Sequence, residues 1–440
     1  MKYPIGIQSF DRIIEDGYVY VDKTELIYNL THESSIYFLS RPRRFGKSLL
    51  VSTLKNYYLG RRELFRGLAM ERLETEWAVH PVFHVDFNST NFTNPGELEQ
   101  KLDFYVSRWM NQYGLPPEIK ALGIGDRFVE VLRAAHERTG RRAVVLIDEY
   151  DKPMLDVLDV DASLEDRHRN VLKAFYSVFK AADEHLQFVL LTGVTKFSQV
   201  SVFSGFNQPK DISMDGRYET LCGITQDEID RYFPEPIADM AADYRCTPEE
   251  MKQRLKLQYD GYHFSDRLTD VYNPFSLLNA LDSRRIYDYW FRSGTPTYLI
   301  RLLAHFNENI NELTGKYYRP EEFVDYKADV ERPLPMIFQS GYLTIKNYNF
   351  QFNTFLLDFP NNEVKNGFLT MLATSYLKPQ EEMGTWIRDM VMTLQAGDTD
   401  RLRTLFTSFL ASIPYTCGAR KTKPNANATS STRSTSSCAW

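Results

Sequence analysis

The 440-residue chain is poor in cysteine and has no apolar run long enough to cross a bilayer. Its four cysteines form no C-x-x-C pair, so we expect neither a disulfide framework nor a zinc site. No segment approaches the roughly 20 apolar residues of a transmembrane helix, and no amino-terminal stretch joins a basic start to an apolar run. These absences predict a cytoplasmic protein with no membrane segment.

The chain also lacks an excess of positive charge. Lys and Arg total 52 against 58 Asp and Glu, and residues 415–440 hold four of the bases and no acid. The preceding part therefore has 48 bases against 58 acids, a formal net charge of −10. This balance argues against broad, charge-driven nucleic-acid binding, although a local basic groove is compatible with it.

One glycine is missing from the motif around which the rest of the chain is organised. The apolar run Ile36–Leu39 precedes Arg41-Pro42-Arg43-Arg44-Phe45-Gly46-Lys47-Ser48, which we call the phosphate loop. This order predicts a strand, a phosphate-binding turn and the start of a helix. The G-x-x-x-x-G-K-[ST] pattern has glycine where this chain has Arg41, which leaves a decayed loop as the alternative.

The remaining residues of the loop suit the phosphates of ATP. Such a ligand needs several backbone N–H donors, a cation and a hydroxyl that converge on one point. Gly46 lets the backbone approach closely, Lys47 can reach the β and γ phosphates, and Ser48 can hold Mg²⁺. We also predict that Arg43, Arg44 and Phe45 contact the nucleotide. The alternative for the two arginines is that they pair with an acid such as Asp151.

A second motif follows about 100 residues later. The run Ala143–Ile147 has no polar face, as in a central parallel strand that is buried on both sides, and it ends in Asp148 and Glu149. Ligands bind at the carboxyl ends of such strands. We therefore expect Asp148 to orient Mg²⁺ and Glu149 to polarise the attacking water.

The next apolar run, Phe188–Leu191, ends in Thr192 and Thr195. A hydroxyl at this strand end could touch the γ-phosphate or the attacking water, and we include Thr192 with Glu149 and Lys47 as catalytic candidates. The alternative is a threonine that only caps a turn.

The alternation of strands and helices over residues 35–195 predicts an α/β fold. We expect a P-loop NTPase with a doubly wound, mainly parallel sheet over residues 1–235. Residues 236–414 should form a mostly helical domain with a winged-helix-like hairpin, in which Asn347–Asn349 makes the turn. Expected helices include those from about Pro95 to Tyr113, Asp126 to Thr139, Thr225 to Tyr232 and Pro248 to Tyr259.

Weaker candidates lie elsewhere in the chain. Arg217 could act as an arginine finger, but an arginine in a loop is more often solvated. Asp22-Lys23-Thr24 could recognise a base or simply begin a helix. His84 and His136 have no partners at metal-ligand spacing, so we interpret both as structural.

Several stretches resemble a bacterial AAA-ATPase-like family. The resemblance spans roughly residues 3–414, and the family itself has arginine where this chain has Arg41, which favours a family variant over decay. It implies a P-loop ATPase domain that is usually followed by a restriction-endonuclease-like nuclease domain. The stretches that carry it are Pro4-Ile5-Gly6, Tyr20–Thr24, Arg41–Ser48, Leu146–Asp151, Thr192–Thr195, Tyr259–Tyr262, Tyr272–Ser276, Gly294–Pro296 and Phe338–Leu343.

The resemblance stops at Pro414. Residues 415–440 are rich in Ser, Thr, Asn and Ala, a composition that cannot bury a core. Permitted codons for Thr416–Trp440, read out of phase, can give a helix-like string of the kind that the family has there. We expect a disordered tail produced by a frameshift, with Cys417 and Cys438 as accidental residues and no nuclease activity, which resequencing of the gene would test.

These patterns favour a Mg-dependent ATPase that couples its nucleotide state to the attached helical domain. One alternative is a nucleotide-dependent switch or scaffold with little hydrolysis, acting on a protein partner or as a homo-oligomer. Another is a nucleic-acid-binding regulator that uses the hairpin, which the net charge does not support.

Overall fold

The computed structural model describes residues 1–158, 160–196, 209–292, 313–324, 333–368 and 383–412. The chain divides into two compact units, Met1–Phe368 and Leu369–Trp440. The sheet, the helical part and the candidate site described below all belong to the first unit. The boundaries expected near residues 235 and 414 stay predictions, and the expected frameshift tail lies outside the described residues.

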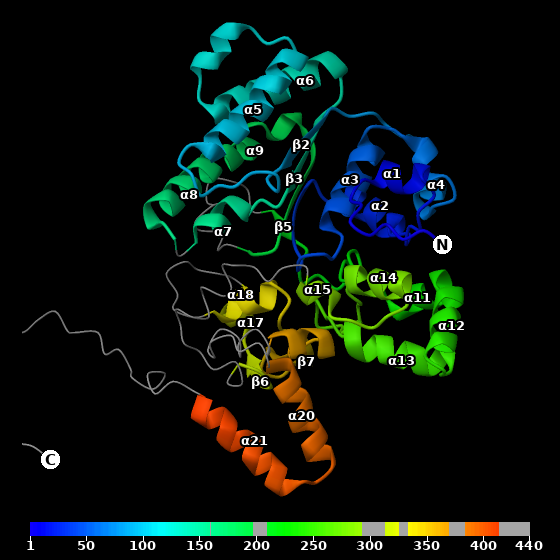
Figure 1. Ribbon diagram of the computed structural model, residues 1–440. Coiled ribbons are helices and arrows are strands. Elements are labelled where there is room, and N and C mark those ends of the chain that lie inside the picture. The colour runs from blue at the N-terminus through cyan, green and yellow to red at the C-terminus, as the bar shows by residue number, and fades with distance from the viewer. Residues whose placement is uncertain (159, 197–208, 293–312, 325–332, 369–382, 413–440) are drawn as a thin grey trace, which may run out of the picture. The chain divides into compact units, whose positions relative to one another are not determined.

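A parallel sheet forms the centre of the first unit (Figure 1). Its order is β2-β3-β4-β1-β5, and each neighbouring pair is parallel. The strand β4 therefore lies between β1, which leads into the phosphate loop, and β3, which ends at Asp148. The strands are β1 (Ile36–Ser40), β2 (Val82–Asp86), β3 (Ala143–Asp148), β4 (Leu186–Gly193) and β5 (Lys210–Asp211).

Helices cover both faces of this sheet, as the alternating sequence predicts. In Figure 1 the strands run between one group that contains α1 to α4 and another that contains α5, α6, α8 and α9. All six residues of β3 are buried, which explains why its sequence has no polar face. The helices are α1 (Phe10–Glu15), α2 (Thr24–Glu33), α3 (Lys47–Tyr58), α4 (Ala69–Leu73), α5 (Glu97–Gln112), α6 (Ile124–Thr139), α7 (Lys152–Val157), α8 (Ala162–Tyr176) and α9 (Val178–Ala181), with short 3₁₀ turns at Arg62–Phe65, Pro117–Ala121 and Asp183–His185.

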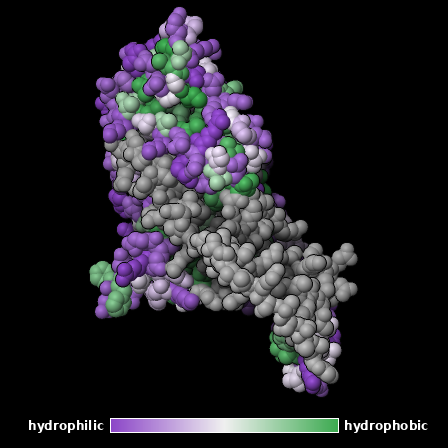
Figure 2. Space-filling view, turned by 90° about the vertical axis from the view of Figure 1, so that its left-hand side faces the viewer, coloured by the Kyte–Doolittle hydropathy of each residue, from purple (hydrophilic) through white to green (hydrophobic). Residues whose placement is uncertain are grey.

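The outer helices are amphipathic. Leu98, Leu102 and Val106 recur on the buried side of α5, while Phe104 on the same helix is exposed. Figure 2 shows one face of the molecule, which is mostly purple at the height of α5 and α6 with green patches between. The apolar stripe of these helices thus packs inward and the polar stripe faces solvent.

A helical part follows the sheet. Thr225 and Thr247 each form a capping box, with Glu228 and Glu250, and so fix the starts of α11 and α13. These helices bury a common core that includes Phe233 and Tyr272. The helices are α11 (Gln226–Tyr232), α12 (Pro234–Asp243), α13 (Pro248–Tyr259), α14 (Pro274–Ser283) and α15 (Tyr289–Arg292).

A small antiparallel sheet completes the first unit. It has the order β6-β8-β7 and contains β6 (Lys316–Tyr318), β7 (Thr344–Asn349) and β8 (Thr354–Asp358). The hairpin is confirmed, but its turn is at residues 350–353 and not at Asn347–Asn349, which belongs to β7. The strand continues because the ladder pairs Asn349 with Thr354. Two short helices precede the hairpin, α17 (Pro320–Phe323) and α18 (Leu334–Gln339).

In the second unit the described residues form two helices that contact each other, α20 (Met383–Gln395) and α21 (Thr399–Ser412). Throughout the described part of the chain, no helix combines the length and the apolar character needed to cross a membrane.

Candidate functional site

The phosphate loop joins β1 to α3, as predicted. Gly46 caps α3 with a φ of 96°, a left-handed conformation that strains any residue with a Cβ atom. A Cβ atom at this position would have no atom within 4 Å, so backbone conformation and not crowding requires the glycine. Arg44 also has a positive φ, of 69°, and this costs free energy in a residue other than glycine.

Lys47 is buried at the first position of α3. Its Nζ donates hydrogen bonds to the carbonyl oxygens of Arg41, at 2.9 Å, and Pro42, at 3.1 Å. Burial lowers the pKa of Lys47, whereas the negative charges of Glu149 and Asp148 raise it. The ammonium group thus lies within the loop, close to the predicted carboxylates.

Arg41, the residue that replaces the expected glycine, is part of the protein interior. Its guanidinium donates to the carbonyl oxygens of Ser40, Ser213 and Tyr218 at 2.9, 2.7 and 3.2 Å, and it stacks on the ring of Phe264 at 4.1 Å. Burial lowers the pKa of Arg41 to about 10. The side chain therefore holds the start of the phosphate loop against Ser213, Tyr218 and Phe264.

Asp148 lies at the end of β3, next to the end of β4. The hydroxyl of Thr192 donates a hydrogen bond of 2.6 Å to Oδ1 of Asp148, and both side chains are buried. Because β4 pairs with β3, Thr192 lies next to Asp148 and can orient its carboxylate. Its direct contact with phosphate or water stays a prediction.

Glu149 directly follows β3 and has a φ of 54°, an uncommon conformation for a residue with a long side chain. Burial raises the pKa of Glu149, the positive charge of Lys47 lowers it, and Asp151 raises it again. A carboxylate whose pKa is raised accepts a proton more readily, as a general base requires.

The carboxylate of Asp151 binds the two residues that follow β4, Val194 and Thr195. Its Oδ2 accepts hydrogen bonds from the backbone N–H groups of Val194, at 2.9 Å, and Thr195, at 2.6 Å, and from the Thr195 hydroxyl at 2.7 Å. Gly193 permits this approach, because a Cβ atom there would lie 2.6 Å from Oδ1 of Asp151. Thr195 is thus bound to Asp151 through both its backbone N–H and its hydroxyl.

A cavity of about 560 Å³ opens beside the phosphate loop. Its lining brings together Arg43, Arg44, Gly46, Lys47 and Ser48 from the loop and Glu149 from the end of β3. Several other lining residues were not predicted from the sequence. They include Pro4–Gln8 at the amino terminus, Asn88 after β2, Lys152, and Pro274, Phe275, Leu278 and Trp290 from the helical part.

A smaller cavity of about 100 Å³ shares part of this lining. The two cavities have Pro4, Gly46, Leu49, Pro274 and Leu278 in common. Most of the other residues around the smaller cavity are apolar, and they include Val19, Val21, Phe45, Leu221 and Ile224. The loop therefore borders a larger cavity of mixed polar and apolar lining and a smaller, mainly apolar cavity beside it.

Phe45 is buried and does not line the larger cavity. Its ring packs edge-on against Tyr262, at 4.8 Å between centroids, and Phe264, at 5.4 Å. Trp290 donates from its indole Nε1 to the carbonyl oxygen of Arg43 at 3.1 Å. The helical part thus contacts the phosphate loop directly, from residues more than 200 positions later in the sequence.

The weaker candidates do not line the larger cavity. Arg217 is paired with Asp215 and Glu33. Asp22 accepts hydrogen bonds from Thr24 and from the backbone N–H of Ala69, while Lys23, which lines the smaller cavity, pairs with Glu228. His84 is partly buried, and His136 contacts His185.

Among the described residues, no group of three or more His, Cys, Asp or Glu side chains is arranged to hold a metal ion. The hydroxyl of Ser48 and the carboxylate of Asp148 are oxygen donors of the type that Mg²⁺ prefers, and Mg²⁺ commonly takes its other ligands from water and phosphate. The donor types at these two positions are therefore those that Mg²⁺ sites use.

Comparison with known proteins places the chain in a family. A family model described as Predicted AAA-ATPase matches residues 4–203. A protein of Azotobacter chroococcum mcd 1, described as "Uncharacterized protein in vnfD 5'region", is 37% identical over 427 residues, which are 94% of this chain and 78% of that protein.

A solved structure of the Aeropyrum pernix ORC2 protein in ADPNP–ADP complexes matches 82% of this chain and 98% of its own. Its sequence identity to this chain is 12% and the TM-score is 0.28. The assignment depends on the motifs, the parallel sheet and the extended sequence match. The chain belongs to the AAA-ATPase-like family of predicted ATPases.

Proposed function

We propose that this protein binds Mg·ATP in the larger cavity, hydrolyses it slowly and couples the nucleotide state to its helical part. One observation carries the proposal. A single cavity of about 560 Å³ is lined by Gly46, Lys47 and Ser48 from a phosphate loop and by Glu149 from the end of the central strand. The backbone N–H groups at the start of α3 add the partial positive charge that phosphate requires.

The phosphates would be held at the start of α3. Lys47 would give up its bonds to the carbonyl oxygens of Arg41 and Pro42 and turn toward the β and γ phosphates. Arg43 and Arg44 line the same cavity and would add positive charge. Ser48 and Asp148 would hold Mg²⁺, which when bound neutralises developing charge on the phosphates.

Glu149 would act as the general base. It lines the cavity, and burial raises its pKa. A partly buried carboxylate beside Lys47 can orient a water molecule and take its proton. Thr192 would act through Asp148, whose carboxylate it holds at 2.6 Å.

The adenine base of ATP would lie between Pro4, near the amino terminus, and Pro274, at the start of α14. Pro4, Pro274 and Leu278 line both cavities, and apolar residues dominate the smaller one. A flat, uncharged ring such as adenine is favoured in such surroundings. The Asp22-Lys23-Thr24 stretch would contribute only through Lys23, which lines the smaller cavity.

Titration with ATP and Mg²⁺ tests the proposal, with wild type compared with Lys47→Ala and Glu149→Gln. We expect Lys47→Ala to weaken binding at least tenfold, and Glu149→Gln to bind ATP normally but to lose hydrolysis. Lys55→Ala, which removes a lysine from the same helix, is the matched control and should behave as wild type. Unchanged ATP affinity in Lys47→Ala would refute the site.

Direct contact between the loop and the helical part favours one alternative, a nucleotide-dependent switch with little hydrolysis. Trp290 bonds to Arg43, and Tyr262 packs on Phe45, so the nucleotide state can reach the helical part without turnover. Equal and negligible turnover in wild type and Glu149→Gln, with tight ATP binding in both, would support the switch.

A further inference from the structure

We propose that the segment Tyr262-His263-Phe264 transmits the state of the phosphate loop to the β7–β8 hairpin. This inference rests on the proposed nucleotide site and names the route by which that site would regulate a distant part of the molecule. The 262–264 segment has its two aromatic side chains against the loop and its central residue against β7.

On the loop side, the contacts are aromatic and close. The rings of Tyr262 and Phe264 pack against Phe45, and the ring of Phe264 also lies under the guanidinium of Arg41. Tyr262 is fully buried and Phe264 nearly so. Protein interiors are close-packed, and the cavity that Arg41, Tyr262 and Phe264 line together is only about 30 Å³, so a shift of Arg41 or Phe45 would displace these rings.

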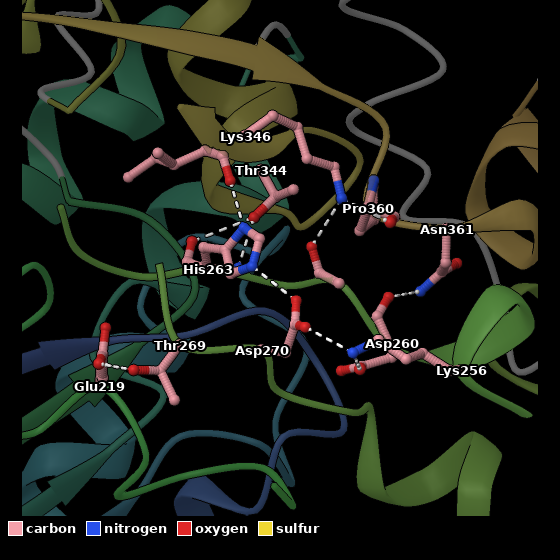
Figure 3. Close-up of polar contacts among 12 residues, drawn as sticks. Glu219, Lys256, Asp260, His263, Thr269, Asp270, Thr344, Lys346, Pro360 and Asn361 are labelled. Atoms are coloured by element: carbon pink, nitrogen blue, oxygen red, sulfur yellow. Dashed lines mark hydrogen bonds and ion pairs between the residues drawn. The ribbon is translucent and has the colours of Figure 1, made fainter. Parts of the chain in front are cut away.

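On the hairpin side, the contacts are hydrogen bonds (Figure 3). The backbone N–H of His263 donates to Oγ1 of Thr344 at 2.8 Å, and this hydroxyl donates to the His263 carbonyl oxygen at 3.0 Å. The Nδ1 of His263 lies 2.6 Å from the carbonyl oxygen of Ile345. His263 is thus joined to two successive residues of β7.

Charged groups fix His263 in this position. Its Nε2 lies 2.7 Å from Oδ1 of Asp270, whose Oδ2 accepts from Lys256 at 2.8 Å. Both ring nitrogens face oxygen atoms, those of the Ile345 carbonyl and the Asp270 carboxylate, so the ring is held from both sides. Lys346 of β7 also joins the hairpin to the residue before this segment, because its Nζ donates to the carbonyl oxygens of Gly261 and Pro360 at 2.9 and 2.8 Å.

A second contact joins the same two parts. Gly341, three residues before β7, has a φ of 88°, and a Cβ atom there would lie 2.6 Å from Cβ of Pro42. Pro42 and Arg41 are the two residues whose carbonyl oxygens hold Lys47. The residues released when Lys47 turns to phosphate are therefore those that contact Gly341 and Phe264.

Hydrogen–deuterium exchange of the hairpin amides, residues 344–358, tests this route. In wild type, saturating Mg·ATP should change the exchange rate of these amides at least threefold. Thr344→Val keeps the shape of the side chain and removes both of its hydrogen bonds to His263. We expect it to bind ATP within twofold of wild type and to lose the response of the hairpin.

The matched control is Thr354→Val, which changes a threonine of β8 that pairs with Asn349 in the same hairpin. It should keep the wild-type response. If ATP binds to wild type and the hairpin amides do not respond, the route is wrong and the proposed function stands. The route is also wrong if Thr344→Val responds as wild type does.

A measurement without nucleotide separates the proposed route from the proposed function. Lys47→Ala removes the ammonium group from the carbonyl oxygens of Arg41 and Pro42, so it imitates the departure of Lys47 from them. We expect faster or slower hairpin exchange in this variant than in wild type, by at least threefold, and no change in Lys55→Ala. Failure of ATP to bind would overturn the proposed function, whereas an unchanged hairpin in Lys47→Ala would overturn the route.

Discussion

The hydroxyl of Thr192 donates a hydrogen bond of 2.6 Å to the carboxylate of Asp148, and water reaches neither side chain appreciably. A buried carboxylate that loses a hydrogen-bond donor is both destabilised and free to rotate. The effect of Thr192 on chemistry should therefore pass through Asp148.

Replacement of Thr192 by valine should slow Mg-dependent ATP hydrolysis by about 10-fold to 100-fold, the usual cost of losing a residue that orients a metal ligand. Thr192→Ser keeps the hydroxyl and should recover most of the rate. The apparent affinity for Mg²⁺, measured from the dependence of the rate on its concentration, should weaken only in the valine variant. Similar rates in the two variants would show that the hydroxyl is dispensable.

Arg41 and Arg44 belong to the same loop but should affect different properties. Arg41→Ala removes the donor to the carbonyl oxygen of Ser213 and one of the two donors to that of Tyr218, and it empties the space over Phe264. It should therefore lower the free energy of unfolding by about 2–4 kcal/mol. Urea denaturation measures this loss.

The matched variant is Arg44→Ala, since Arg44 lines the larger cavity. It should change stability by less than about 1 kcal/mol and weaken ATP binding severalfold in calorimetric titration. A large loss of stability in Arg44→Ala, or none in Arg41→Ala, would contradict this division of roles.

Gly341 and Gly315 provide a matched pair for the contact with Pro42. Both have a positive φ, of 88° and 68°, so alanine at either position should cost about 1–2 kcal/mol of strain. A Cβ atom on Gly315 meets open space, whereas on Gly341 it meets Pro42 at 2.6 Å. Gly341→Ala should therefore weaken ATP binding in addition, and Gly315→Ala should not. Equal ATP affinities in the two variants would show that this contact does not reach the nucleotide site.

Local patterns were sufficient to predict the alternation of parallel strands and helices and part of the site. The apolar run before Asp148 and the helical spacing after Gly46 gave the correct elements, and the rule for parallel strands correctly brought Glu149 to the loop. The same rule could have identified Asn88, which follows the end of β2 and also lines the cavity.

The rest of the site depends on contacts between distant residues. Trp290 reaches Arg43 across 247 positions, and no periodicity marks such a pair. The motif has glycine at the position of Arg41, and the sequence does not indicate where an arginine side chain would go. In the structure it does not line the larger cavity, and its partners are backbone carbonyl groups that sequence does not distinguish.

Glu363 should make stability depend on pH. It is 1% exposed and accepts a hydrogen bond of 2.7 Å from the backbone N–H of Trp290, and burial raises its pKa to about 8 from an ordinary value of 4.5. Between these two values the folded chain holds a proton that the unfolded chain has released. This contribution to stability is therefore fully present below about pH 4.5 and is lost as the pH rises through about 8.

Glu363→Gln cannot release that proton and still offers an oxygen to Trp290. Wild type should lose up to about 1.4 kcal/mol of unfolding free energy per pH unit relative to this variant between pH 5 and pH 8. Urea denaturation at half-unit pH steps measures the difference, with Glu25→Gln, an exposed glutamate of α2, as the control that should follow wild type. Parallel stability curves for wild type and Glu363→Gln would mean that Glu363 ionises in the folded protein as readily as in the unfolded chain.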